Sequence, residues 1–557
     1  MIAVRQLALL LCLAATAATA QQSTTKPKPT PTPLATDAVI TADRDAENPR
    51  ALKLSLDSAI GTAMQRNLGV ELQRYDYRIS GYSLRSAYGL FDPLATAEIL
   101  KQSNNNPVTS PFFASGSDTT LLNFGLRHFL PTGGSYSAGF NSNRSERVGG
   151  GTFINPAYNS ELALQANQPL LRNFGVDVNR RQINIARNTL GISQEAFRAR
   201  LINTSVSVED AYLDLIYARQ VLDVARQSLF LASDQERITR IRIDVGASAP
   251  LDILQPRVAV ATRQEQLIAA QAAVRDAEDR LRQLMNLDTA EWDRPIIPTD
   301  NVGARVGAID LDKAVATALA LRPELRQLKL GTGIREIEYT FARNQTLPQL
   351  DLNVSYGAAG LGGRSAEIDP VTGRPTGRIS RTTYANGLGQ VFGNEFPSWT
   401  VGLNVEIPLT NIGARSLKKR AELELERARA DEDTTRQIIT VEVRKAVRDI
   451  ETAANQIIAS RAARDAAEKN LDAEKKRYEN GMTTNFNVLL IQQQLSDARV
   501  SELRALVFYD KAVSNYHRAI GDLLDEKNIA INEEVFDAPR SRLESVPWLQ
   551  YGNYEKK

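Results

Sequence analysis

The chain has 557 residues and a nearly balanced charge, with 67 Lys and Arg against 65 Asp and Glu. The chain has no excess of basic residues that would indicate binding to nucleic acid, so we expect no nucleic-acid partner. After residue 20 there is no apolar run of about 18 residues, so the sequence predicts no membrane-spanning helix.

Residues 1–20 resemble a secretory signal. They carry one basic residue, Arg5, then an apolar stretch and a small-residue ending, Ala18-Thr19-Ala20. Lipid attachment at Cys12 is disfavoured because Leu11, not a small residue, precedes it. Removal of the signal would leave no cysteine, so an exported chain must rely on packing or association. Residues 21–52 follow as a tether rich in Pro and Thr.

The rest of the chain repeats itself. The segment Leu56–Ala63 returns as Leu311–Ala318, at an offset of 255 residues that holds as far as Pro93 and Pro348. Later matches have shorter offsets, as for Gly246 and Gly481. The sequence therefore predicts repeat 1 at 53–305, repeat 2 at 306–525 and a C-terminal tail at 526–557, with each repeat beginning with a helix.

Each repeat contains a very long helical hairpin, predicted at 176–292 and 414–520. No Gly or Pro occurs from Ala414 to Asn480, and short turns follow at 245–250 and 480–484. The returning helices are expected at 257–294 and 482–520. Many of their apolar positions are alanine, which favours a single layer of helices over a thick core.

Between the helices, apolar and polar residues alternate as in β-strands. Strands are predicted across about 93–169 and at about 349–357 and 398–408, with a polar loop at 357–397. An additional hairpin around Pro131 would either add two strands to the sheet or extend above it. Such strands suit an outer-membrane β-barrel, and the alternative is a soluble sandwich with one wet face.

Taken together, the chain resembles the TolC-type outer membrane efflux proteins. The resemblance rests on motifs that occur in order in both repeats. These are Arg322-Pro323-Glu324-Leu325, Leu347-Pro348-Gln349-Leu350, Gln168-Pro169-Leu170, Ile407-Pro408-Leu409 and Arg477-Tyr478-Glu479-Asn480-Gly481.

This resemblance implies an α+β membrane protein that assembles as a homotrimer. Long antiparallel helical hairpins would form a periplasmic α-barrel, joined to a β-barrel in the outer membrane and its lipid. The implied partners are a periplasmic membrane-fusion adaptor and an inner-membrane pump of RND or ABC type. No cofactor and no metal are implied.

The resemblance also implies two kinds of site. Adaptor docking would fall on the helix-turn-helix tips, although glycine there would suit a plain turn equally well. The channel would narrow just beyond, where Asp252 would form an acidic ring or merely cap its helix. The tip residues are Val245, Gly246, Ala247, Ser248, Asn480, Gly481, Met482 and Thr483, and the gate candidates are Asp252, Asn487 and Leu490.

Catalytic motifs are missing from the sequence, and its two histidines, His128 and His517, have no metal-ligand spacing. The sequence therefore predicts a passive exit duct for efflux or type I secretion, not an enzyme. The alternative is a periplasmic coiled-coil scaffold anchored in the outer membrane. A polar inner face on the strands distinguishes the two, because an anchor needs no water-filled lumen.

Overall fold

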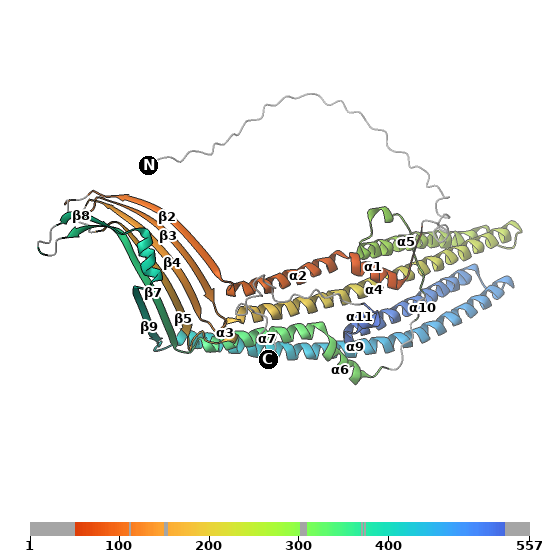
Figure 1. The fold of residues 1–557 in the computed structure, drawn as a ribbon. Coiled ribbons are helices and arrows are strands. Elements are labelled where there is room, and N and C mark those ends of the chain that lie inside the picture. The colour runs from red at the N-terminus through yellow and green to blue at the C-terminus, as the bar shows by residue number, and fades with distance from the viewer. Residues whose placement is uncertain are drawn as a thin grey trace, which may run out of the picture. The chain divides into compact units, whose positions relative to one another are not determined.

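The computed structural model describes residues 51–107, 109–110, 113–149, 154–300, 303, 309–368, 371 and 375–529. The predicted signal at 1–20, almost all of the tether and most of the C-terminal tail lie outside the described residues. Within the described part, long helices lead into a β-sheet (Figure 1).

The helices form one layer. The two longest, α4 (Arg181–Asp244) and α9 (Ile412–Glu479), run through it. Beside α4 lie α2 (Leu68–Tyr88) and α5 (Leu254–Met285), and between α4 and α9 lie α7 (Pro323–Asn344) and α10 (Asn485–Ile520). The alanine-rich sequence predicts such a single layer (Figure 1). The contacts add that four long helices lie side by side toward the sheet, α2, α4, α7 and α9, and four toward the hairpin turns, α5, α4, α10 and α9.

The main core lies around the middle of the long helices. There the short helices α1 (Leu56–Arg66), α6 (Leu311–Leu321) and α11 (Leu523–Glu526) pack against the layer. Helix α6 begins 255 residues after α1, and both have a side-chain N-cap, at Ser55 and Asp310. The short strands β1 (Leu52–Leu54) and β6 (Ile296–Pro298) pair in parallel beside them.

The sheet has seven strands. In sequence order they are β2 (Leu94–Asn105), β3 (Gly116–Phe129), β4 (Ser135–Val148), β5 (Ile154–Pro169), β7 (Gln349–Ile368), β8 (Pro375–Arg381) and β9 (Phe396–Glu406). Neighbours pair antiparallel in the order β2-β3-β4-β5-β7, and both β9 and β8 pair with β7. The additional hairpin around Pro131 therefore lies within the sheet, between β2 and β5.

Register sorts the side chains of the sheet onto two faces. Leu126, Ala138, Leu164, Tyr356 and Trp399 follow one another across five strands on the apolar face. One residue along each strand, the side chains are polar. The alternation seen in the sequence is therefore aligned from strand to strand, since a slip of one residue would reverse the faces.

The prediction of a polar loop at 357–397 is wrong, because the range contains a strand and a helix. Strand β7 continues to Ile368, and helix α8 (Tyr384–Phe392) packs on the apolar face near that end of the sheet. Small residues permit this close approach: a Cβ added to Gly360 would lie 2.0 Å from the carbonyl oxygen of Gly387. Glycine in a polar segment, which suggested a loop, here serves helix–strand packing.

The predicted end of the first hairpin, at 292, is also wrong, as is the predicted end of its return helix, at 294. Both predictions extend the helix too far. Helix α5 ends at Met285 because Asn286 adopts the left-handed conformation, with φ 49° and ψ 55°. Asparagine is among the few side chains that tolerate this conformation, so a segment free of Gly and Pro can still end a helix. Two of the predicted helix ends, at Glu479 and Ile520, agree within one residue.

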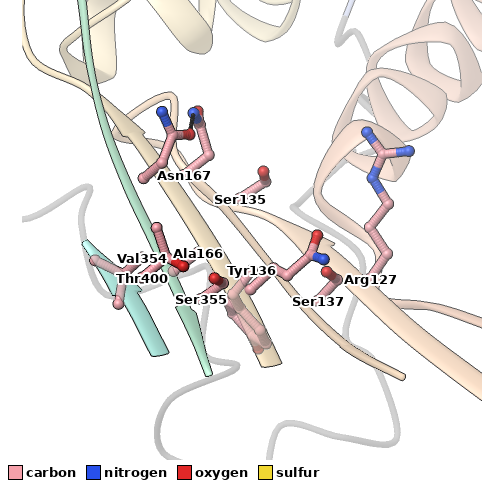
Figure 2. Close-up of a pocket in the computed structure, with 11 residues that line it drawn as sticks. Arg127, Ser135, Tyr136, Ser137, Ala166, Asn167, Val354, Ser355 and Thr400 are labelled. Carbon is pink, nitrogen blue, oxygen red and sulfur yellow. Dashed lines mark hydrogen bonds between the residues drawn. The ribbon is translucent and has the colours of Figure 1, made fainter. Parts of the chain in front are cut away.

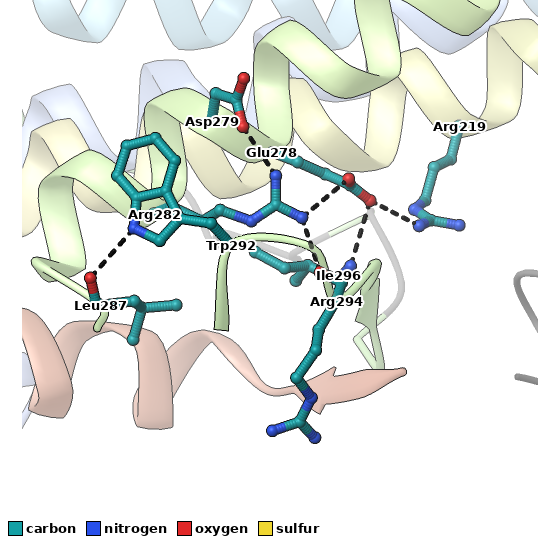
Figure 3. Close-up of polar contacts among 8 residues, drawn as sticks. All are labelled: Arg219, Glu278, Asp279, Arg282, Leu287, Trp292, Arg294 and Ile296. Atoms are coloured by element: carbon teal, nitrogen blue, oxygen red, sulfur yellow. Dashed lines mark hydrogen bonds and ion pairs between the residues drawn. The ribbon is translucent and has the colours of Figure 1, made fainter. Parts of the chain in front are cut away.

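A buried charge cluster attaches the segment after α5 to the layer (Figure 3). One Glu278 oxygen accepts hydrogen bonds from Arg219 Nη2 at 2.8 Å and from the backbone N–H of Ile296 at 3.1 Å. The other accepts from Arg282 Nη2 at 3.1 Å, and Arg282 also donates to the Arg294 carbonyl at 2.6 Å. Glu278 therefore connects α4, α5 and β6.

We expect Glu278→Gln to lower the free energy of unfolding by about 3–5 kcal/mol, because it leaves the half-buried Arg219 guanidinium without its counter-charge and the buried Arg282 with only the exposed Asp279 as a partner. Chemical denaturation in detergent measures this loss. The control is Glu336→Gln, which breaks a 3.0 Å pair with Arg429 whose side chains are more than half exposed. That change should cost less than about 1 kcal/mol. Equal losses in the two variants would contradict the assigned role of Glu278.

Candidate functional site

The two hairpin tips have the same backbone geometry. After α4, the N–H of Ala247 donates to the Arg242 carbonyl at 2.7 Å, and after α9 the N–H of Met482 donates to the Arg477 carbonyl at 2.9 Å. Gly246 and Gly481 lie at these turns with φ of 75° and 72°. Both tips are thus left-handed helix caps, which favour glycine for its backbone freedom. A Cβ at either position would meet nothing within 4 Å.

Large apolar side chains are exposed at both tips. We call Val245, Leu251, Met482 and Phe486 the tip apolar residues; their exposed fractions are 73%, 76%, 76% and 56%. Leu251 and Phe486 each follow the tip glycine by five residues. Apolar surface left in water at two matched places costs free energy, which burial against a partner would recover. Of the other predicted tip residues, Gly246, Ala247, Asn480 and Gly481 are exposed, whereas Ser248 and Thr483 are half-buried.

The three gate candidates are exposed, and the polar contacts of two of them are local. The Asp252 carboxylate accepts from the backbone N–H of Ala249 at 3.1 Å and so caps the short turn Pro250–Ile253. Asn487 donates to Thr483 Oγ1 at 3.0 Å, on its own side of the tip. Leu490 is 45% exposed. Capping and a gating role are compatible for Asp252, because its side chain still faces solvent.

A contact between the two hairpins, which the sequence did not predict, lies directly behind the tips. The Arg242 guanidinium carbon lies 4.2 Å from the centroid of the Tyr478 ring, and Nη2 donates to the Tyr478 carbonyl at 3.2 Å. Nearby, the buried pair Gln235 and Asn485 is joined by a 2.8 Å hydrogen bond. Arg242 and Tyr478 are four and three residues before their glycines, but their pairing joins segments 236 residues apart.

Further from the tips, polar contacts continue between α4 and α10. Lys511 pairs with Asp214 at 2.7 Å, and Ser514 donates to the buried Glu209 at 2.8 Å. Burial is the main factor that raises the pKa of the neighbouring Asp210 above its ordinary 3.8. Burial, followed by a hydrogen bond to Asp300, raises the pKa of Tyr212 to about 12, so this phenol remains a donor. The two hairpins are therefore connected by polar groups along this helix pair.

The polar face of the sheet provides the second candidate surface (Figure 2). Register places Arg127, Ser137, Gln165, Ser355 and Thr400 at one level across five strands. They line an open hollow of about 400 Å³, together with Ser135, Tyr136, Ala166, Asn167, Asn353 and Val354. Hydroxyl and amide groups dominate this lining, so the face suits contact with water and hydrophilic solutes.

Over the residues that the structure describes, no cluster of three or more His, Cys, Asp or Glu side chains could hold a metal ion. His128 is buried near the end of strand β3, where its ring nitrogens contact the Tyr136 hydroxyl at 3.0 Å and the Phe91 carbonyl at 2.9 Å. His517 contacts Asp522 at 3.0 Å, which raises the pKa of this imidazole. Both histidines therefore have structural contacts. In the described residues, no helix is long and apolar enough to cross a bilayer.

The structure combines a long helical layer, two matched tips and a sheet with one apolar and one polar face. This combination places the chain in the class of outer membrane channel proteins, as the family match shows. The model of the outer membrane efflux protein family matches residues 135–287 and 314–522, which is more than half of the chain. The chain belongs to this family, the TolC-type outer membrane efflux proteins, as its motifs predict.

Individual relatives agree with this assignment. The outer membrane efflux protein BepC of Brucella suis is 24% identical over 64% of this chain and 70% of its own length. The alkaline protease secretion protein AprF of Pseudomonas aeruginosa is 25% identical over 63% of this chain and 68% of its own. The crystal structure of the Campylobacter jejuni CmeC outer membrane channel has a TM-score of 0.61 at 15% identity, covering 88% of this chain and 91% of that one. It supports the fold alone.

We expect Arg242→Ala to loosen the tips relative to each other, because it removes the contact with Tyr478. With spin labels at Ala247 and Met482, pulsed electron paramagnetic resonance should show a broader distance distribution. Arg240→Ala is the matched control, since Arg240 pairs with Glu236 of its own helix at 2.7 Å. Identical distributions in wild type and Arg242→Ala would show that the pair does not hold the tips together.

Proposed function

We propose that three copies of this chain form a passive duct out of the cell. The strands would form a β-barrel through the outer membrane, and the helices would continue it as a tube into the periplasm. The observation that carries this proposal is the two-faced sheet: its apolar face suits lipid and its polar face suits a water-filled lumen. The duct would hydrolyse nothing and would depend on a partner for energy.

The free edges of the sheet support closure by further copies. Strand β2 is exposed along all twelve of its residues, and β9 is exposed except at Gly402. Unpaired strand edges are ready to hydrogen-bond with another chain. Successive antiparallel pairing gives β2 and β9 opposite directions, so β9 of one copy can pair antiparallel with β2 of the next. A head-to-tail contact of this kind closes into a ring.

The scaffold alternative explains less of the sheet. A protein that is merely anchored in the membrane needs the apolar face but has no use for the continuous polar face, which includes Arg127, Gln165 and Thr400. The exposed tips suggest where the partners bind. We assign them to a periplasmic adaptor that links the duct to an RND or ABC pump, and their apolar side chains supply the contact.

The relatives' names cover both expected uses, since BepC is named for efflux and AprF for alkaline protease secretion. For this chain we therefore propose export of either kind. The gate would lie behind the tips, where a ring of Asp252 carboxylates, one from each copy, would favour cations over anions.

Purified protein in planar lipid bilayers should form ion-conducting channels with a preference for cations. Asp252→Asn should reduce that preference, because it removes one negative charge per copy while keeping an oxygen that can still cap the turn. Reversal potentials under a salt gradient measure the effect. Absence of channels under all conditions would refute the duct, whereas unchanged selectivity in the variant would refute only the gate.

Replacing Leu251 and Phe486 together by serine should weaken adaptor binding by at least about 100-fold, because burial of each side chain contributes roughly 1.5–3 kcal/mol. Binding of the purified adaptor from the same cell's export systems can be followed by interferometry. The control carries Leu171→Ser and Phe174→Ser, which alter exposed apolar residues between β5 and the helices, far along the chain from the tips. Full binding by the tip variant would exclude docking through these residues.

A further inference from the structure

The hairpin formed by β3 and β4 has the same two faces as the rest of the sheet. Phe124 lies opposite Phe140, and Leu126 opposite Ala138, on the apolar face. One residue along, Asn123 lies opposite Asn141 on the polar face. With 14 residues each, both strands are at least as long as β2 and β9. Nothing in this pattern distinguishes β3 and β4 from the neighbouring strands, so the hairpin can form part of a barrel in the same way as they do.

The turn of this hairpin is built into the junction between the sheet and the helices. The Thr132 carbonyl accepts from the N–H of Gly175 at 3.1 Å, and Thr132 Oγ1 donates to Gln168 Oε1 at 2.9 Å. The buried ring of His128 contacts the Phe91 carbonyl, at the end of the segment that follows α2. The hairpin therefore runs the height of the sheet down to the helices and does not project above the sheet.

We propose that this hairpin widens the membrane section of the duct, so that three copies close as a barrel of 18 strands. This inference rests on the proposed ring of three copies. Six strands span each copy from edge to edge, since β8 pairs only with the far end of β7. The even number is essential, because it leaves β2 and β9 antiparallel at the contact between copies.

The dimensions of the helix layer favour the wider ring. At a strand spacing of about 4.8 Å and a tilt of about 40°, 18 strands give a backbone diameter of about 36 Å, whereas 12 would give about 24 Å. Four helices across each copy give a ring of 12 helices, and at a spacing of about 9 Å its diameter is about 34 Å. With the hairpin, the barrel would have nearly the same diameter as the helical tube, so the duct would not narrow where the two meet.

Such a barrel would not select among cargoes by width. The hollow on its polar face is lined mainly by hydroxyl and amide side chains, such as Ser137, Asn167 and Ser355, beside the longer Arg127 and Gln165. Hydrophilic cargo of any width would pass, and wide cargo such as compact polypeptide segments would benefit most. Selection would then fall to the tips and the partners.

Site-directed spin labelling of the full chain in lipid nanodiscs tests the position of the hairpin. The one cysteine, Cys12, lies in the predicted signal, so single labels can be introduced. Oxygen should reach labels that face lipid, and a water-soluble nickel chelate should reach those that face the lumen. We expect alternation with period two along both β3 and β9. The lipid positions are Leu122, Phe124, Leu126, Val401 and Leu403, and the lumen positions are Asn123, Arg127, Thr400 and Asn404.

Strand β9 separates the two possible failures. Alternation on β9 without alternation on β3 would overturn the widened barrel and leave the duct intact. Loss of alternation on both strands would overturn the duct, and the barrel with it.

A deletion variant supplies the second measurement. Removing residues 116–148 leaves β2 and β5 joined by the remaining loop residues, in the antiparallel direction that pairing requires. In planar bilayers, poly(ethylene glycol) added from the outer side should enter the full-length channel at sizes that the variant excludes. Equal size limits for the two channels would overturn the proposal.

Discussion

The interaction on which the structure depends is the continuous backbone pairing that keeps one sheet in a single register. Since side chains alternate between faces, each strand must hold its register for the apolar face to remain apolar. Pairing is unbroken along β3–β4 and β4–β5, and β5–β7 shifts between Ile154 and Ala157. The short β7–β8 pairing also shifts. Both shifts lie near the loop end of the sheet, away from the helices. The faces are therefore best defined where the sheet meets the helical layer.

The helical layer is subject to a different constraint, which is where it can bury apolar side chains. A single layer cannot bury a helix on all sides, so the chain concentrates much of its core at mid-length. A further buried cluster, which includes Tyr88 and Ile183, lies at the sheet end. Clusters around Leu325 and Val443, and around Phe197 and Leu523, lie where the short helices thicken the layer. Toward the tips, where Val488 and Leu495 are still buried, hydrogen bonds and cation–π contacts are added, as between Arg242 and Tyr478. Apolar burial therefore holds the middle of the layer, and near the tips it is joined by polar contacts between the two hairpins.

Much of this architecture could be predicted from the sequence because it depends on local periodicity. Helix ends at Gly246 and Gly481 follow from glycine's freedom to adopt positive φ, and the strands follow from two-residue alternation. Helix α8 and the long β7 were missed because Gly360 and Gly387 suggest a loop until their close packing is seen. The end of α5 at Asn286 was missed because asparagine can form a left-handed cap without glycine. Arg242 and Tyr478 could not be paired, since their contact depends on how two hairpins pack.

The two halves of the chain differ most where each leaves the helical layer and returns to it. Between β2 and β5 the first half inserts a segment in which apolar and polar residues alternate from Leu122 to Leu126 and from Tyr136 to Phe140. This alternation adds two strands in the plane of the sheet. Between β7 and β9 the second half inserts a glycine-rich segment, and this folds back as α8 against the apolar face. Strands added in the plane widen the sheet, whereas a helix packed on its face leaves the width of the sheet unchanged. Side-chain periodicity in one inserted segment is thus enough to change the number of strands in the sheet while the four-helix layer stays the same.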